Sequence, residues 1–177
     1  MNSPNLVLSD VETQLLNLHY VSFRVLPQEY KKDRIPYIRD LTEIVSTCRV
    51  SIRGWDMPLF DAKILTPLED SVCSGFSQGR YVEAWRVYKS CQFDFIELCT
   101  EEDQDFQAKL KDNGRDYGGV TFFLSWINVI YSFCEYFEFA KRYAVRAQLS
   151  EGIIVEVNYR NMLNVGLSTD EIGRAHV

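Results

Sequence analysis

Residues 120–147 constrain the fold most strongly, because this stretch fits one long helix whose first half carries no charge. Small polar residues form a single stripe in that half, and the other positions are apolar nearly all round. A helix of this kind has to be covered by other elements on most sides. Apolar side chains mark one face of it at helical spacing: Phe123, Ile127, Ile130, Cys134, Phe137 and Ala144.

Short segments on both sides of this helix alternate apolar and polar residues, which is typical of strands with one covered face. The turn Lys89-Ser90-Cys91 is expected to join two of them into a hairpin, and one helix over residues 82–99 is the alternative interpretation. The predicted strands are residues 20–26, 49–53, 71–77, 81–88, 92–95 and 153–159, with the start of another at 165–167.

A second helix is predicted to open at Pro36, where the missing N–H of proline costs nothing, and its apolar residues recur at helical spacing as far as Cys48. Residues 57–69 contain two prolines and no clean period, so we expect a long loop there. The acidic stretch 101–116 is expected to be a solvated loop or a short surface helix. This order predicts an α+β fold, in which a mostly antiparallel or mixed sheet carries one amphipathic helix and one long, largely buried helix packed on it.

The end of the chain does not resemble natural protein sequence. Residues 172–177, Ile-Gly-Arg-Ala-His-Val, match the translation of a common short-read sequencing adaptor. We therefore expect residues 1–170 to be a single α+β domain that is truncated at its C-terminus, and residues 171–177 to be foreign. On this interpretation His176 is not a candidate for chemistry.

The charge and the cysteines narrow the classes of function. The net charge of −6 and the absence of a Lys/Arg stripe argue against nucleic acid as a partner. Five widely spaced cysteines without a CxxC pair indicate reduced thiols in a cytoplasmic protein. The longest uncharged run, residues 118–134, is shorter than the roughly 20 residues that span a membrane.

Most standard catalytic signatures are missing from the sequence. It has no P-loop, no dinucleotide-binding glycine motif, no HExxH and no calcium loop. His19 is the remaining histidine once His176 is set aside, and no pattern nominates a nucleophile beside it. We therefore predict no catalytic residue, no cofactor and no metal ligand.

Two patterns have residue types that anchor ligands. The first, Arg53-Gly54-Trp55-Asp56, leaves the predicted strand 49–53, and the second lies on the predicted strand 81–88. If residues 81–88 are a strand, the side chains of Glu83 and Trp85 share one face and those of Arg86 and Tyr88 the other. Arg and aromatic side chains are typical of binding sites, although the alternative is that the tryptophans are core and the arginines are paired at the surface. The predicted ligand-binding residues are Arg53, Trp55, Asp56, Glu83, Trp85, Arg86 and Tyr88.

The strings RGWDMP (Arg53 to Pro58) and EAWRVYKSCQF (Glu83 to Phe93) resemble patterns of a group of uncharacterised bacterial and archaeal proteins. The second string often reads closer to EAWRxYxSGQF in that group, so Cys91 replaces a glycine here. The resemblance covers most of the chain from Tyr20 onward. It implies a prokaryotic protein that is associated with regulatory or DNA-binding proteins, and it implies no catalytic residue.

These observations support three hypotheses about function. The first is a non-catalytic cytosolic binding or sensor module for a small ligand or an unknown protein partner, accessory to a regulatory or DNA-associated protein. The second is a carboxylate- and arginine-based hydrolase that acts on a nucleotide or a phosphodiester. It requires Arg53, Asp56, Glu83 and Arg86 to converge in one pocket. The third is a nucleic-acid-binding protein.

Overall fold

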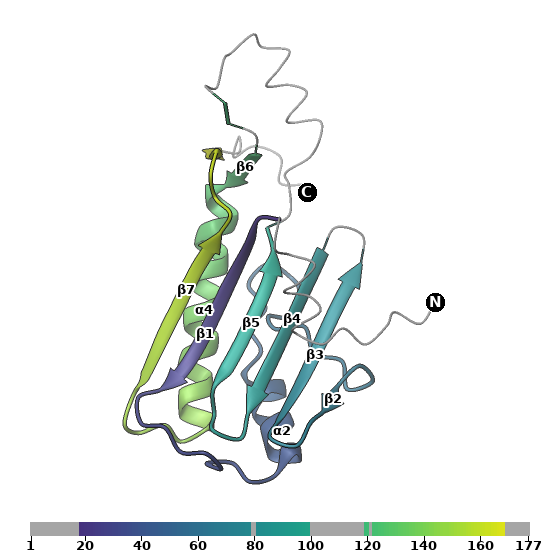
Figure 1. Ribbon diagram of the computed structural model, residues 1–177, viewed down its shortest axis with the longest axis vertical. Coiled ribbons are helices and arrows are strands. Elements are labelled where there is room, and N and C mark those ends of the chain that lie inside the picture. Colours follow the sequence, from purple (N-terminus) through teal and green to yellow (C-terminus); the bar gives the residue numbers. More distant parts are fainter. Residues whose placement is uncertain (1–17, 79–80, 100–118, 121, 169–177) are drawn as a thin grey trace.

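The computed structural model describes residues 18–78, 81–99, 119–120 and 122–168. Within them, six strands form one sheet in the order β2-β3-β4-β5-β1-β7 (Figure 1). Every pairing in this sheet is antiparallel. The strands are β1 (Tyr20–Pro27), β2 (Thr66–Pro67), β3 (Ser71–Gln78), β4 (Tyr81–Tyr88), β5 (Phe93–Leu98) and β7 (Ile153–Arg160). The predicted α+β class and its mostly antiparallel sheet are therefore confirmed.

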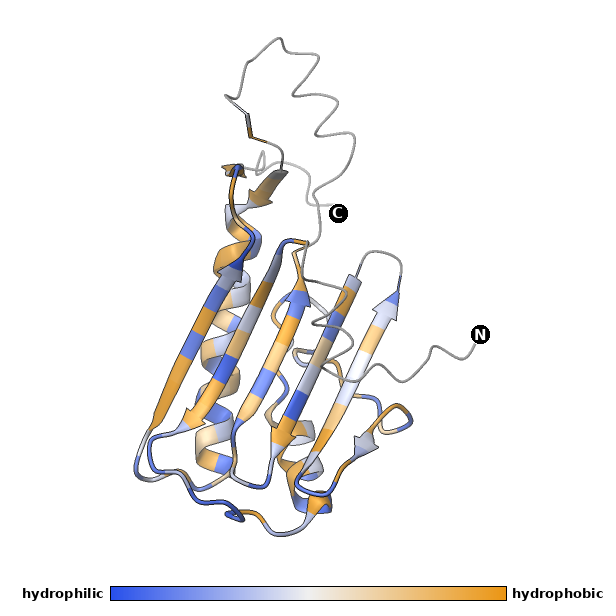
Figure 2. Cartoon of the chain, in the orientation of Figure 1, coloured by the Kyte–Doolittle hydropathy of each residue, from blue (hydrophilic) through white to orange (hydrophobic). Residues whose placement is uncertain are grey.

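Two helices, α2 (Ile38–Cys48) and α4 (Trp126–Arg146), lie on the same face of the sheet, behind it in Figure 1. The opposite face carries no described helix or strand, and we call it the open face. The helix-covered face holds the core, because every second residue of each strand points to it. Figure 2 shows the resulting alternation of apolar and polar residues along the strands.

Aromatic side chains make up the centre of this core. The ring of Phe23 on β1 stacks on Tyr136 of α4, with centroids 4.8 Å apart. Phe93 on β5 packs against Phe139 of the same helix at 4.5 Å. All four residues are fully buried, so these rings fasten the long helix to the sheet.

The predicted hairpin between β4 and β5 is confirmed. The amide of Tyr88 donates to the carbonyl of Gln92 at 2.9 Å, and the amide of Cys91 donates to the carbonyl of Tyr88 at 2.8 Å. Cys91 has a φ of 65°, a left-handed conformation that favours glycine. This is the position at which the resembling pattern has glycine.

The strand predicted at residues 49–53 is wrong. Only Val50 pairs there, in an isolated bridge to Met57, and the rest of the segment bends. Gly54 turns the chain with a φ of 91°. Arg53 then binds a carboxylate of α4 through its side chain, so the segment is held by side-chain contacts instead of by a neighbouring strand.

The long helix begins later than predicted. Residues before it form β6 (Phe122–Ser125), which pairs in parallel with β8 (Val165–Ser168). Ser125 ends the strand and caps the helix, since its hydroxyl accepts from the amide of Asn128 at 3.4 Å. The strand predicted to start at residue 165 is present.

The face of α4 that packs on the sheet is not the predicted one. Ile130 and Phe137 are 49% and 54% exposed, and Cys134 is exposed as well. The first half of the helix is apolar on most sides, so spacing alone did not separate the two faces. The buried residues of α4 are Ser132, Glu135, Tyr136, Phe139, Ala140 and Tyr143.

Residues 101–116 and 171–177, for which a surface loop and a foreign tail were predicted, lie outside the described residues. Among the helices that the structure does describe, none combines the length and the apolar character needed to cross a membrane.

Candidate functional site

The four predicted binding residues of β4 lie on two different faces of the sheet. Glu83 and Trp85 face the helices and are buried. Trp85 belongs to the core, where its Nε1 donates to the carbonyl of Leu59 at 2.9 Å. Arg86 and Tyr88 project from the open face, as expected from the alternation. A pocket that joins Glu83 to Arg86 is therefore not formed.

Arg86 and Tyr88 are engaged in contacts within the open face. The Nε of Arg86 donates to the hydroxyl of Ser71 at 3.0 Å, and its Nη2 lies 3.4 Å from Asp70 Oδ1. The guanidinium also lies 4.6 Å from the ring centre of Tyr88. Arg86 thus has an anionic and an aromatic partner in the protein itself.

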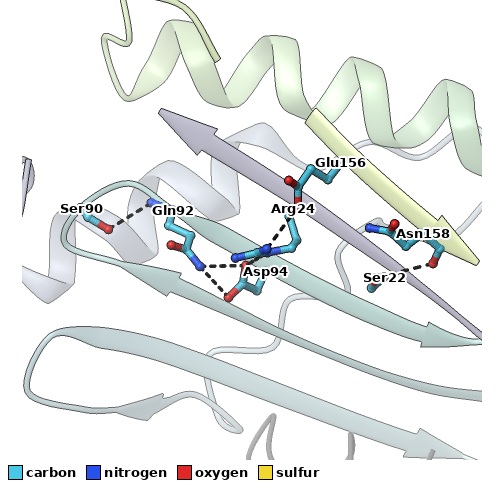
Figure 3. Close-up of polar contacts among 7 residues, drawn as sticks. All are labelled: Ser22, Arg24, Ser90, Gln92, Asp94, Glu156 and Asn158. Carbon is cyan, nitrogen blue, oxygen red and sulfur yellow. Dashed lines mark hydrogen bonds and ion pairs between the residues drawn. The ribbon is translucent and has the colours of Figure 1, made fainter. Parts of the chain in front are cut away.

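A second network on the open face surrounds Arg24 (Figure 3). Its Nε donates to Asp94 Oδ1 at 3.0 Å, and its Nη1 donates to Glu156 Oε2 at 3.1 Å. The side-chain nitrogen of Gln92, Nε2, donates to both oxygens of Asp94, at 3.1 and 3.0 Å. Acidic and basic groups alternate across the strands here, so each charge lies beside an opposite one.

The loop between α2 and β2 sends Arg53 into the layer between the sheet and α4. Its Nε and Nη2 donate to Glu135 Oε2 at 3.0 and 2.5 Å, and its backbone amide donates to Oε1 at 3.3 Å. The guanidinium also lies 4.9 Å from the ring centre of Trp55. Asp56 takes no part in this arrangement and pairs with Arg49 at 2.5 Å.

Three glutamates lie close together here, and two of them, Glu97 and Glu135, act on Arg53. Glu83 on β4 and Glu97 on β5 are directly opposite each other in the sheet register, and Glu135 comes from α4 with no exposed side-chain surface. Two like charges at opposed positions destabilise a sheet unless other groups compensate them. We call Glu83, Glu97, Glu135 and Arg53 the acid cluster.

Burial dominates the ionisation of the acid cluster. It raises the pKa of Glu83 to about 8, and repulsion from Glu97 and Glu135 adds to this effect. Hydrogen bonds from the Tyr81 hydroxyl and from the Leu59 amide act in the opposite direction. At neutral pH, Glu83 is therefore mostly protonated.

Glu97 has a different environment. Burial raises its pKa as well, and Glu135 reinforces the rise, whereas a hydrogen bond from Tyr136 and the charge of Arg53 lower it. The hydroxyl of Tyr136 donates to Glu97 Oε1 at 2.5 Å. Unlike Glu83, Glu97 lines a pocket.

The pocket has a volume of about 180 Å³ and lies between the ends of five strands and the first turns of α4. Trp55 lines it while 46% of that residue stays exposed, so the indole reaches the solvent side. Apolar side chains of the sheet, of β6 and of α4 form much of the remaining wall. The polar and aromatic groups around it include Arg53, Trp55, Tyr81, Glu97, Asn128 and Tyr159.

Of the seven predicted residues, Arg53 and Trp55 line this pocket, and Glu83 lies in the acid cluster behind it. Glu97, Glu135 and Tyr81 were not predicted. One signal for Glu135 was available, since it is the first charge after the uncharged run 118–134. No local signal marks Glu97, because its role depends on the strand register.

Within the residues that the structure describes, no group of three or more His, Cys, Asp or Glu side chains is arranged to hold a metal ion. Comparison of the chain with protein-family models, with curated proteins and with solved structures found no match. A proposal for the function therefore depends on the geometry of the pocket.

Proposed function

We propose that this protein is a non-catalytic binding module whose small ligand occupies the pocket beside Trp55. The observation that carries the proposal is the way in which the indole is held. Trp55 lies against the guanidinium of Arg53, and Glu135 fixes that guanidinium from the buried side. An aromatic ring that is fixed in place and still partly exposed loses little freedom on binding, which favours recognition.

The polar groups near the pocket support binding over turnover. Arg53 is bound to Glu135, Glu97 accepts from Tyr136, and Glu83 accepts from the Leu59 amide. Groups that are already hydrogen-bonded within the protein orient a ligand well. A nucleotide or phosphodiester hydrolase is less well supported, because Glu83 and Arg86 are on different faces and the acid cluster repels anionic substrates.

A cytoplasmic location is part of this proposal. All five cysteines are free thiols, and three of them, Cys48, Cys73 and Cys91, are buried as small core residues. Protein thiols stay reduced in the cytosol, whereas extracellular compartments favour disulfides.

The test is a nuclear magnetic resonance titration with small aromatic probes of different charge, namely benzylamine, benzyl alcohol and benzoate. We expect at least one probe to shift the amide signals of pocket residues such as Leu124 and Val129 in a saturable way. Trp55→Ala should weaken this binding about tenfold or more, and Val129→Trp should block it by filling the pocket. Tyr30→Ala removes an aromatic side chain that is 74% exposed elsewhere and should leave binding unchanged.

The proposal fails if no probe perturbs the pocket residues of the folded wild-type protein. It also fails if Trp55→Ala and Tyr30→Ala have the same effect, because the binding then depends on exposed aromatic surface in general.

A further inference from the structure

The pocket wall contains one acidic group, Glu97, whose neighbouring cation, Arg53, forms its ion pair with Glu135 instead. Arg53 lines the pocket, but two of its donors and its backbone amide are taken up by Glu135. Glu97 lines the same pocket, and the contact at its Oε1 comes from a neutral hydroxyl, that of Tyr136. The guanidinium thus acts mainly on Glu135 and less on Glu97, which leaves Glu97 as the acidic group of the pocket wall.

Among the residues that the structure describes, the other ionisable groups around Glu97 do not supply a positive charge. Glu83 lies opposite it on β4 with Tyr81 nearby, Cys99 follows it on β5, and Tyr159 comes from β7. On α4 the neighbours are Glu135 and Tyr136. All of these side chains are neutral or acidic. Arg53, on the loop between α2 and β2, is the cation among these neighbours, and it is already bound.

Aromatic groups complete a site for a cation. Trp55, Tyr81 and Tyr159 all line the pocket. The faces of aromatic rings attract cations, tryptophan most strongly, and Trp55 already binds the guanidinium of Arg53 in this way. A carboxylate together with aromatic walls is the usual combination for recognition of an ammonium group.

The size and the apolar part of the wall limit the ligand further. The volume of about 180 Å³ is close to that of cavities of about 150 Å³ that hold one benzene ring. Val21, Leu98, Leu124 and Val129 contribute apolar surface. A ligand that fits therefore has a short hydrocarbon body and a single charged end.

We infer that the ligand is a small organic amine, with its ammonium group between the carboxylate of Glu97 and the aromatic wall that includes Trp55. This inference rests on the proposed binding function and adds the chemical class of the ligand. It differs from the phosphate chemistry considered from the sequence, because the unbalanced charge in the pocket is negative.

The experiment compares the affinities of benzylamine, benzyl alcohol and benzoate, which share one ring and differ in charge. We expect benzylamine to bind at least about tenfold more tightly than benzyl alcohol, and benzoate to bind more weakly than both. Glu97→Gln should reduce the preference for the amine to less than about twofold. Glu156→Gln, which removes a carboxylate from the open face, should leave the preference unchanged.

If Glu97→Gln does not fold, the pH dependence of binding to the wild-type protein tests the same role of Glu97. Burial raises the pKa of Glu97 above the ordinary glutamate value, so its carboxylate forms at a higher pH than that of an exposed glutamate, while benzylamine stays protonated. The affinity of the wild-type protein for benzylamine should increase as Glu97 loses its proton with rising pH, while its affinity for benzyl alcohol should not.

Two outcomes would overturn the inference, and they have different consequences. If benzyl alcohol or benzoate binds the pocket as tightly as benzylamine does, the ligand class is wrong and the binding function stands. If none of the three probes binds, the binding function fails together with the ligand class.

Discussion

The two faces of the sheet carry the same kinds of charged residues in opposite arrangements. On the open face, Arg24 lies between Asp94 and Glu156, and Arg86 lies beside Asp70. On the helix-covered face, the acid cluster has three glutamates and one guanidinium, that of Arg53, which is ion-paired with Glu135. The open face is balanced and partly solvated, whereas the covered face has an excess of acid and little contact with water.

This difference shows why burial, and not residue type, marks the candidate site. An ion pair at the surface contributes little to stability, because water and salt screen it. A buried carboxylate loses its hydration, so it keeps its charge only with a strong partner and otherwise takes up a proton. The raised pKa values of Glu83 and Glu97 are the direct result. Acid groups in the covered layer are costly to the fold, which is a reason to look for function there.

The largest expected effect comes from breaking the buried ion pair. Arg53→Ala leaves Glu135 with no exposed surface and without its cation, so we expect the free energy of unfolding to fall by about 3–5 kcal/mol. Urea denaturation would measure this loss. The double variant Arg53→Met with Glu135→Leu removes both charges and should be clearly more stable than Arg53→Ala. If the single variant loses less than about 1 kcal/mol, the covered face is no more sensitive to charge than the open face.

The second effect is a dependence of stability on pH that Glu83 causes. Its pKa is about 8 in the folded state and near 4.5 in the unfolded chain, so the folded state holds the proton more tightly. Stability from this group is therefore complete below about pH 4.5 and decreases as the pH rises towards 8. One pKa unit corresponds to about 1.4 kcal/mol, and we expect a loss on the order of 3–4 kcal/mol between pH 5 and pH 8.

Glu83→Gln should remove this loss, because the amide resembles the protonated acid. The stability difference between the variant and the wild type should shift in favour of the variant as the pH rises, as measured by urea denaturation at several pH values. Glu156→Gln on the open face provides the control, and its curve should run parallel to that of the wild type. Parallel curves for Glu83→Gln would show that Glu83 is already charged in the folded protein.

The secondary structure was largely predictable from the sequence because alternation is a local signal. The β4–β5 hairpin, β1 and β7 follow from the period of two, since one face of each strand is buried. Two errors have the same origin. Residues 49–53 alternate but find no strand to pair with, and the start of the long helix was placed over β6, whose parallel partner, β8, lies about 40 residues later in the chain.

The candidate site was less predictable, since it depends on contacts between distant segments. Arg53 and Trp55 were selected for their residue types, and both line the pocket. The register that sets Glu83 against Glu97, and the helix face that brings Glu135 to Arg53, are not encoded locally. The apolar spacing in α4 even indicated the wrong face, because the first two buried residues of the helix, Ser132 and Glu135, are polar.

The third effect concerns the hydroxyl that supports Glu97. Tyr136→Phe removes the donor to Glu97 Oε1, so a buried carboxyl loses one of its hydrogen bonds, and we expect a loss of about 1–2 kcal/mol in unfolding free energy. The pKa of Glu97 should rise further, because this hydrogen bond lowers it in the wild type. Carbon-13 detection of the glutamate carboxyl during a pH titration measures the change. An unchanged pKa of Glu97 would mean that Tyr136 serves only the packing of the core.

The smallest effect is expected on the open face, although Arg24 has two ionic partners there, Asp94 and Glu156. Its side chain is 40% exposed, so water replaces the contacts that Arg24→Ala removes, and we expect a loss of less than about 1 kcal/mol. Added salt should reduce the difference between the variant and the wild type further, because exposed charges are screened. Urea denaturation at low and high salt measures the size of this loss and its dependence on salt. Arg53→Ala is measured under the same conditions for comparison. If Arg24→Ala is as destabilising as Arg53→Ala and insensitive to salt, solvation does not separate the two faces, and the excess of acid around the pocket loses its significance as a sign of function.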